Sequence, residues 1–279
     1  MATTDPPAPL AIPPPADVNE LVRLMRLPRA GIVTDIDGTI APLAATPGAA
    51  RVDADARRAL LRLIPRLTLV TALTGRRAAD GAALLQIPEM PVVGNHGMEM
   101  LVGETLTADA DAARYAPNVH RVIERMHVAP LPPGTILEDK GPTASVHYRL
   151  APNHREAHVA LVALLAPLVA AEGLHLTEGR ALFEIRPPVP IHKGHALTRL
   201  CAAYALDAVV MFGDDLTDVD AFDALRTLRA AGKVSGLNVG VVAPDGTAPP
   251  EVLASVDAIA TGVTGIAALL TAIADALEA

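Results

Sequence analysis

The chain has no tryptophan, and its three tyrosines and three phenylalanines make aromatic residues only 2% of the 279 residues. Its single cysteine, Cys201, excludes an internal disulfide framework and any zinc site that needs two thiolates. Lys and Arg number 23 against 31 Asp and Glu, so no broad basic surface is available to follow a nucleic-acid backbone. We therefore expect neither a disulfide scaffold nor a nucleic-acid partner.

Long uncharged apolar segments are also lacking. The longest run, residues 159–171, is about two-thirds of a membrane-spanning length and contains Pro167. The first residues have neither the basic region nor the long apolar region of a secretory signal. These features predict no membrane partner and a cytoplasmic location. Residues 1–16 are rich in Pro and Ala, which predicts a disordered or extended tail.

What the chain does contain is a repeated alternation of short apolar runs and amphipathic segments. Continuous apolar runs predict buried strands at 31–34, 67–73, 91–93, 208–212 and 237–242. Helical patterns are found near 17–26, 53–63, 78–85, 193–206, 219–229 and 264–278. Buried strands that alternate with helices are typical of a parallel sheet covered on both faces.

The middle of the chain has a different pattern. Helices are expected at 120–126 and 154–171, beside strands at 144–150 and 182–185 whose apolar residues alternate with period two. Such alternation indicates an antiparallel sheet with one exposed face. The predicted fold class is α/β: a doubly wound, Rossmann-like parallel-sheet core of residues 17–103 and 188–279. An inserted α/β cap domain of residues 104–187 carries the antiparallel sheet.

Residues 34–39 contain two carboxylates, Asp35 and Asp37, where the first buried strand ends. The first carboxylate can attack phosphorus, and the second can move the proton that an alcohol leaving group needs. The same pattern also occurs in calcium loops and plain hairpins, so residues elsewhere in the chain must decide between these readings.

Two further segments favour phosphate chemistry. Thr74 and Gly75 lie at a strand-to-helix junction, where free backbone amides and a hydroxyl can hold a phosphate. Lys193 opens a predicted helix, which is unfavourable for a cation unless a phosphate or carboxylate lies nearby.

An acidic cluster follows the strand at 208–212. Asp214, Asp215 and Asp218 fall within five positions, and they repel one another unless a cation lies among them. Magnesium prefers such oxygen ligands. The apolar strand before the cluster directs it to the same sheet edge as Asp35, because ligands bind at the carboxyl ends of the strands in open α/β sheets.

In this order and spacing, the four segments resemble the haloacid dehalogenase superfamily of aspartyl-phosphate enzymes. The resemblance implies that Asp35 is the nucleophile and Asp37 the general acid and base. It makes Thr74 and Lys193 phosphate ligands, and it implies an Mg²⁺ cofactor. The implied metal site comprises Asp35, Asp37 through its carbonyl, and Asp214. Asp215 and Asp218 are implied to lie behind these direct ligands or to bind the metal through water.

From about residue 29 to residue 277, the chain is also similar to the trehalose-6-phosphate phosphatase family. The segments that carry this resemblance are residues 94–99, 138–141, 147–149 and 179–187. It implies a sugar phosphate as the small-molecule substrate and a functional coupling to a trehalose-6-phosphate synthase. The substrate-binding residues that it implies are Gly75, Arg76, His96, Glu138, Lys140, Arg149, Arg180 and Glu184.

Two positions depart from the family pattern: Arg180 stands where some relatives have Lys, and Val219 stands where many have Glu. The enzymatic alternative is a related capped phosphatase acting on sucrose phosphate, a glycosyl-phosphoglycerate or a monosaccharide phosphate. The other alternative is a sugar-phosphate sensor that has lost catalysis, but such a sensor is expected to lack Asp35 or Asp37.

Overall fold

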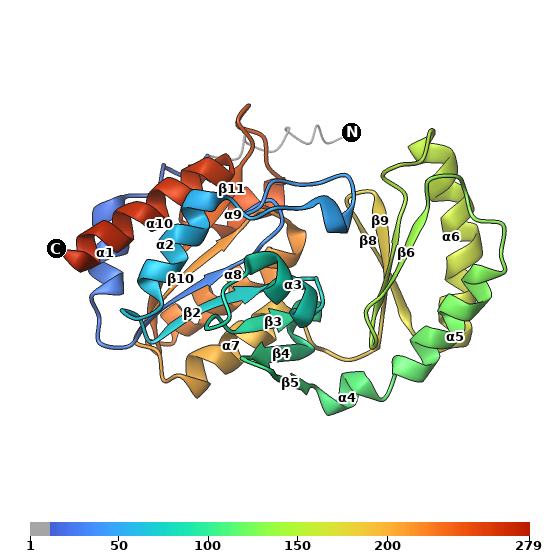
Figure 1. Cartoon of the computed structure of the whole chain (residues 1–279), viewed down its shortest axis with the longest axis horizontal. Helices are drawn as coiled ribbons and strands as arrows, with labels where there is room; N and C mark the ends of the chain where they lie inside the picture. Colours follow the sequence, from blue (N-terminus) through green and yellow to red (C-terminus); the bar gives the residue numbers. More distant parts are fainter. Residues whose placement is uncertain (1–11) are drawn as a thin grey trace, which may run out of the picture.

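The computed structural model describes residues 12–279, which fold into two lobes (Figure 1). The larger lobe is built on one sheet with the strand order β12-β11-β10-β1-β2-β3-β4-β5. The strands from β12 to β3 are parallel, and β4 and β5 are added antiparallel. The strands are β1 (Ala30–Thr34), β2 (Leu69–Leu73), β3 (Val92–Gly94), β4 (Glu99–Val102), β5 (Thr105–Ala108), β10 (Ala208–Gly213), β11 (Ser235–Val242) and β12 (Ala258–Thr261).

Helices cover both faces of this sheet. One face packs against α1 (Val18–Met25), α2 (Ala54–Leu63), α3 (Ala78–Leu85) and α10 (Gly262–Glu278). The other packs against α7 (Lys193–Ala203), α8 (Leu216–Ala230) and α9 (Pro250–Ser255). Neighbouring residues of one strand therefore enter different cores: Ile32 lies in the first and Val33 in the second. Burial on both faces explains why these strands are continuous apolar runs.

The smaller lobe, which we call the cap, contains an antiparallel sheet in the order β6-β7-β9-β8. Its strands are β6 (Ile136–Asp139), β7 (Ala144–His147), β8 (His175–Gly179) and β9 (Leu182–Arg186). Helices α5 (Ala116–His127) and α6 (His154–Ala171) pack on the outer face of this sheet, and the short α4 (Ala110–Ala113) leads into it from the core (Figure 1). The predicted α/β class, with a parallel core sheet and a separate antiparallel sheet, is confirmed.

The chain departs from the predicted boundaries in two places. Thr105–Ala108, expected in the cap, pairs with β4 as the edge strand of the core sheet. The amide of Ala16 donates to the carbonyl of Ile259 at 2.9 Å, and the amide of Ile259 donates to the carbonyl of Pro14 at 2.9 Å. The end of the predicted 1–16 tail is therefore ordered against β12, whereas residues 1–11 lie outside the described residues. The other domain limits remain predictions.

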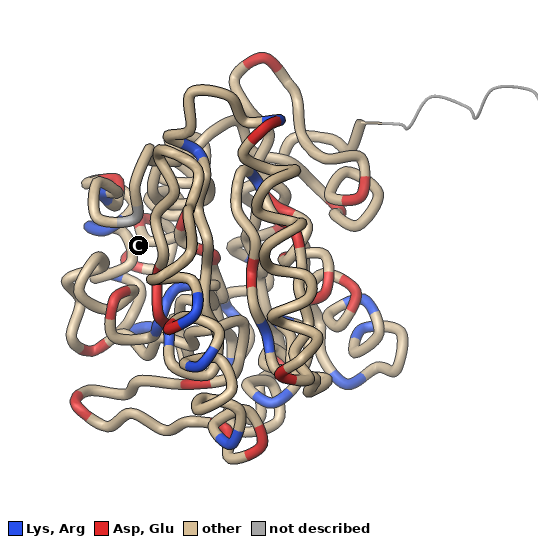
Figure 2. Tube along the Cα trace, turned by 90° about the vertical axis from the view of Figure 1, so that its right-hand side faces the viewer, with Lys and Arg blue, Asp and Glu red and all other residues tan. Residues whose placement is uncertain are grey.

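Among residues 12–279, α6 is the one helix whose length and apolar composition would allow it to cross a membrane. The core helices of many proteins pass the same test, so this is weak evidence for a membrane span. One stripe of α6, which includes Ala157, Leu161, Leu165 and Val169, is buried in the cap core. Viewed from the cap end, the basic and acidic positions are interspersed along the trace (Figure 2).

The core topology brings the predicted site together. Strands β1 and β10 are neighbours, with Thr34 paired to Phe212, so Asp35 and the acidic loop after β10 leave the sheet side by side. The amide of Asp35 still donates to the Phe212 carbonyl at 2.9 Å. Strand β2 lies on the other side of β1 and ends just before Thr74. This edge is where the connections diverge, which is the usual ligand site of doubly wound sheets.

Candidate active site

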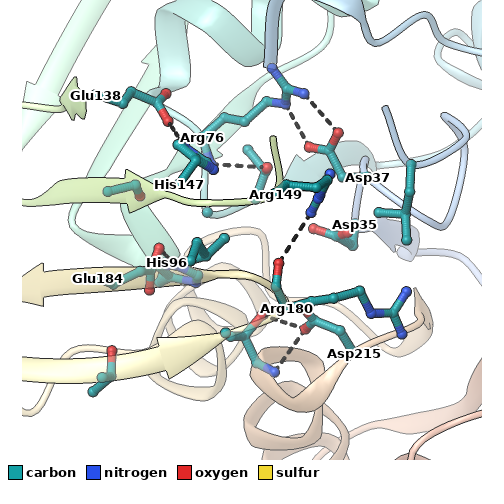
Figure 3. Close-up of a pocket in the computed structure, with 18 of the residues that line it drawn as sticks. Asp35, Asp37, Arg76, His96, Glu138, His147, Arg149, Arg180, Glu184 and Asp215 are labelled. Carbon is teal, nitrogen blue, oxygen red and sulfur yellow. Dashed lines mark hydrogen bonds and ion pairs between the residues drawn. The ribbon is translucent and has the colours of Figure 1, made fainter. Parts of the chain in front are cut away.

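A cavity of about 280 Å³ lies between the carboxyl edge of the core sheet and the inner face of the cap sheet (Figure 3). This volume lies just below the roughly 300–1,000 Å³ that is usual for small-molecule sites. Fourteen of the fifteen predicted site residues line it. Those from the core are Asp35, Asp37, Thr74, Gly75, Arg76, His96, Lys193, Asp214 and Asp215, and those from the cap are Glu138, Lys140, Arg149, Arg180 and Glu184. The remaining one, Asp218, is fully buried just behind them.

Lys193 is the central cation on the core side. Its Nζ lies 2.7 Å from Asp35 Oδ1 and 2.7 Å from Asp218 Oδ1, and all three side chains are buried. Burial lowers the pKa of Lys193, but Asp218 and Asp35 more than offset this, so its pKa lies well above its ordinary value. The two carboxylates explain how a lysine is tolerated as the first residue of α7.

Asp35, Asp214 and Asp218 form a buried cluster in which one carboxylate oxygen from each residue lies within 4.8 Å of the other two. Burial raises the pKa of Asp214 to about 8, and the charges of Asp218 and Asp215 act in the same direction. Burial likewise raises the pKa of Asp35, against the opposing effect of Lys193. The single ammonium of Lys193 does not balance three carboxylates. A hard divalent cation that prefers oxygen ligands, such as Mg²⁺, fits this donor set.

The five acidic residues of the predicted metal site have different partners. Asp218 Oδ2 accepts from the amides of Asp214 at 3.0 Å and Asp215 at 3.2 Å, and Asp218 Oδ1 contacts Lys193, so both oxygens of Asp218 are engaged. Asp215 is the N-cap of α8 and accepts from the Thr217 amide at 2.8 Å. Asp35 and Asp214 therefore have the carboxylates that are best placed to bind a metal. Asp218 instead fixes the acidic loop and holds Lys193.

Asp37 faces the cavity in a bidentate ion pair with Arg76. The distances are 2.5 Å from Arg76 Nε to Asp37 Oδ2 and 2.7 Å from Arg76 Nη2 to Asp37 Oδ1 (Figure 3). Gly38 follows with φ +88°, a conformation that favours glycine, and a Cβ at this position would clash with the Asp214 carboxylate. The turn after Asp37 therefore fits closely against the acidic loop.

Thr74 and His96 form the wall of the cavity beside Asp37. The Arg76 amide donates to Thr74 Oγ1 at 3.2 Å. Gly75 lies against the imidazole of His96, where a Cβ would leave too little space. His96 itself has φ +56°, and so does not follow the usual backbone of a non-glycine residue. Such strain is typical of functional sites.

Two histidine–carboxylate pairs lie at the cap side of the cavity, one within the cap and one between His96 of the core and Glu184 of the cap. His147 Nε2 lies 2.8 Å from Glu138 Oε2, and His96 Nε2 lies 3.1 Å from Glu184 Oε1. Lys140 Nζ lies 3.6 Å from Glu184 and donates to the Gly75 carbonyl at 2.9 Å. Burial favours a higher pKa for Glu184, but His96 and Lys140 reverse the effect and hold its pKa well below the usual range.

Two arginines complete the cap side of the cavity. The Arg149 guanidinium donates to the carbonyl of Ala44, in the core loop after β1, and to the carbonyl of Arg180 at 3.2 Å. Arg180 lies at the turn between β8 and β9, above the acidic loop (Figure 3). The contact between Arg149 and Ala44 joins the cap to the core.

Several residues at the site were not predicted from the sequence. The Asn95 side chain is fully buried between the lobes, where its Nδ2 donates to the Lys140 carbonyl at 3.2 Å and its Oδ1 accepts from Thr143 Oγ1 at 2.8 Å. Ser145 lines the cavity from the centre of the cap sheet. The non-glycine φ of +48° at Asn95 could not be read from the sequence. Only the alternation along residues 144–150 indicated that Ser145 shares a face with the charged residues.

The fold defines a structural class. A buried lysine and an aspartate pair meet an acidic loop at the edge of a doubly wound sheet, below an inserted cap. Solved haloacid dehalogenase-like hydrolases share this fold. A solved haloacid dehalogenase-like hydrolase from Bacteroides thetaiotaomicron superposes with a TM-score of 0.60 at 13% identity, over 87% of this chain and 98% of that one. At this identity the likeness shows the fold alone.

The family model for trehalose-phosphatase matches residues 33–251, so the chain belongs to the trehalose-phosphatase family. It is 34% identical to a trehalose-phosphate phosphatase of Mycobacterium avium, with 74% of this chain and 52% of that protein covered. The homologue from Mycolicibacterium paratuberculosis is 33% identical, with the same coverage. The chain thus spans about half the length of these relatives. The C-terminal domain of the Candida albicans trehalose-6-phosphate phosphatase has the same fold, with a TM-score of 0.75 at 21% identity, over 94% of this chain and 99% of that one.

The largely buried Glu184 side chain, which is 15% exposed, leads to a prediction of pH-dependent stability. Because the pKa of Glu184 is lower in the folded chain, its stabilising contribution is present above its ordinary value of 4.5 and declines as the pH falls below it. Glu184→Gln removes a charge-assisted hydrogen bond and should lower the free energy of unfolding by about 1.5–3 kcal/mol near pH 6. The difference from wild type should shrink below pH 4.5, as measured by urea denaturation across pH.

Glu178→Gln is the matched control, because Glu178 lies on neighbouring β8 with its side chain 63% exposed beside His158. It should change the stability by less than about 1 kcal/mol at any pH. A Glu184→Gln deficit that grows below pH 4.5 would contradict the assignment of a lowered pKa.

Proposed function

We propose that this chain hydrolyses trehalose 6-phosphate to trehalose and phosphate through an aspartyl-phosphate formed on Asp35. The observation that carries the proposal is one shared cavity. On its core side lie the Asp35–Lys193 pair and Asp37, and on its cap side lie the charged groups Glu138 and Arg149. Membership of the trehalose-phosphatase family supports the choice of sugar.

The chemistry divides hydrolysis into two displacements. In the first, a carboxylate oxygen of Asp35 attacks phosphorus, and the bond from phosphorus to the sugar oxygen breaks. Asp37 gives a proton to that leaving oxygen. In the second displacement Asp37 takes a proton from water, the water oxygen attacks phosphorus, and the bond from phosphorus to Asp35 breaks, which frees the Asp35 carboxylate and releases phosphate. General acid–base help of this kind contributes about 10²–10⁴ in rate. Lys193 and Thr74 hold the phosphoryl oxygens and stabilise their charge.

Mg²⁺ is the cofactor in this proposal, held by the carboxylates of Asp35 and Asp214 and by the carbonyl of Asp37. When bound, the ion supplies the positive charge that reduces the repulsion between an anionic nucleophile and an anionic phosphate. Asp218 supports this site from behind, because it fixes both Lys193 and the amides of the acidic loop.

The cap selects the sugar in this proposal. Glu138, Lys140 and Glu184 present charged groups to the cavity, and such groups hydrogen-bond well to sugar hydroxyls. A trehalose-6-phosphate synthase, whose product is the substrate, is the functional partner that we propose. One solved relative in fold is the C-terminal domain of a trehalose synthase regulatory protein, at 12% identity and a TM-score of 0.63. A cytoplasmic location remains a prediction.

A phosphate-release panel tests the choice of substrate. We expect kcat/KM for trehalose 6-phosphate to exceed that for sucrose 6-phosphate, a glycosyl-phosphoglycerate, glucose 6-phosphate and p-nitrophenyl phosphate by about a hundredfold or more. The reason is that each polar group of the cap left without a partner costs roughly 1–3 kcal/mol. Comparable turnover of several unrelated phosphates would reject the trehalose assignment.

Replacing the nucleophile tests the covalent route. Asp35→Asn keeps the shape of the side chain but removes the attacking oxygen anion, so phosphate release should fall by about 10⁴-fold or more. Circular dichroism should remain that of the wild type. Asp223→Asn, on the exposed face of α8, is the control and should retain full activity. Phosphate release by Asp35→Asn within tenfold of wild type would show that Asp35 is not the nucleophile.

Removal of the metal tests the cofactor. Dialysis against EDTA should abolish phosphate release, and Mg²⁺ should restore it. Mg²⁺ should also raise the melting temperature of the wild type, because a ligand that binds the folded state stabilises it. Asp214→Asn should need at least about tenfold more Mg²⁺ for half-maximal activity, the loss expected when one charged ligand is worth about 1.4 kcal/mol. Full activity in EDTA would exclude a metal requirement.

A further inference from the structure

The strand register of the cap places four polar side chains in one row across its inner face. Glu138 of β6 pairs with Ser145 of β7, Ser145 pairs with Glu184 of β9, and Glu184 pairs with Thr177 of β8. Directly paired residues of neighbouring strands share a face of the sheet. All four line the cavity, so this row forms its roof.

The four residues of this row have different hydrogen-bond partners. Glu138 is held by His147 at 2.8 Å, and Glu184 by His96 at 3.1 Å. Thr177 is exposed, so water can reach its hydroxyl. Ser145 is the exception: it is only 1% exposed, and its Oγ has no hydrogen-bond partner among residues 12–279.

An unsatisfied buried hydroxyl is unfavourable. It loses its contacts with water without gaining others, and most buried side-chain polar atoms in proteins do have a partner. The Ser145 hydroxyl is therefore retained at a cost to the free protein. Its place in the wall of the cavity, between two carboxylates, indicates that the missing partner belongs to a molecule bound there.

We propose that Ser145 is a specificity-determining residue whose Oγ hydrogen-bonds a hydroxyl of the sugar held below the cap sheet. This inference rests on the proposed function and extends it to a residue outside the predicted substrate set. The carboxylates of Glu138 and Glu184 only accept hydrogen bonds, whereas the Ser145 hydroxyl can also donate one. Along this row, Glu138 accepts, Ser145 donates and Glu184 accepts a hydrogen bond.

This order selects a class of ligand. A sugar ring carries neighbouring hydroxyls, each of which can donate one hydrogen bond and accept another. Hydroxyls that donate to Glu138 and Glu184 leave an oxygen lone pair that can accept from Ser145. A small aryl phosphate has no hydroxyls to offer and leaves Ser145 unpaired. The effect of Ser145 should therefore appear with a sugar phosphate and not with an aryl phosphate.

The test is Ser145→Ala, which we expect to weaken sugar-phosphate binding while it stabilises the ligand-free protein. KM for trehalose 6-phosphate should rise about 3- to 12-fold, the value of one hydrogen bond, with kcat within about twofold of wild type. kcat/KM for p-nitrophenyl phosphate should stay within about twofold. The melting temperature of the ligand-free variant should rise by about 1–4 °C, because an unsatisfied buried group has been removed.

Two further variants sharpen the experiment. Ser145→Cys keeps a side chain of similar shape but donates weakly, so its KM should lie between those of wild type and Ser145→Ala. Ser235→Ala is the matched control, because Ser235 is exposed at the start of β11, away from the cavity. It should leave KM and the melting temperature unchanged.

The outcomes separate the possibilities. An unchanged KM with a raised melting temperature would mean that the hydroxyl is a packing defect, which overturns the proposal. A lowered melting temperature with equal losses on both substrates would mean a structural role, which also overturns it. Failure of the proposed function would appear instead in the wild type, as no preference for trehalose 6-phosphate. Ser145→Ala is then measured with the sugar phosphate that the panel ranks first, and an unchanged KM for that substrate refutes the role of Ser145.

Discussion

The ammonium of Lys193, buried between Asp35 and Asp218, is the interaction on which the remaining geometry depends. It joins the start of α7 to the end of β1, 158 residues away in sequence, and to the first turn of α8. Removing one partner of a buried ion pair typically costs about 3–5 kcal/mol, because the other charge is left uncompensated. The same contacts hold Asp35, the nucleophile that we propose, in the wall of the cavity. In that proposal, stability and reactivity depend on the same three side chains.

Much of the core could be predicted from the sequence, because strands buried on both faces are continuous apolar runs that end in recognisable turns. The β4–β5 hairpin was missed for the opposite reason. Thr105–Ala108 is exposed along its whole length, so it has no hydrophobic periodicity to indicate a strand. Its assignment to the core comes only from its pairing with β4. The ordered contact of Ala16 with Ile259 is likewise a long-range interaction that a Pro-rich composition conceals.

The catalytic side of the site was predictable from position. Asp35 and Asp214 each follow a strand, and the carboxyl ends of neighbouring parallel strands must meet. The cap side was harder, since its contacts depend on the strand register and on how the two lobes dock. Nothing in the sequence distinguishes Ser145 and Asn95 from other polar residues. Their place at the site follows only from long-range pairing. Family resemblance supplied most of the cap residues, but neither Ser145 of the cap nor Asn95 of the core.

Three of the hydrogen bonds that dock the cap on the core end on a backbone carbonyl. Lys140 reaches the carbonyl of Gly75, Arg149 reaches that of Ala44, and Asn95 reaches that of Lys140. Every residue type has a carbonyl, so an accepting position can change its side chain without losing the docking contact, unless another contact fixes it. Gly75 is fixed by the close imidazole of His96, and Lys140 is itself a donor. Ala44 is therefore the accepting position that is free to change over evolutionary time, while the donors are not. Mutational tolerance at this interface should consequently be one-sided.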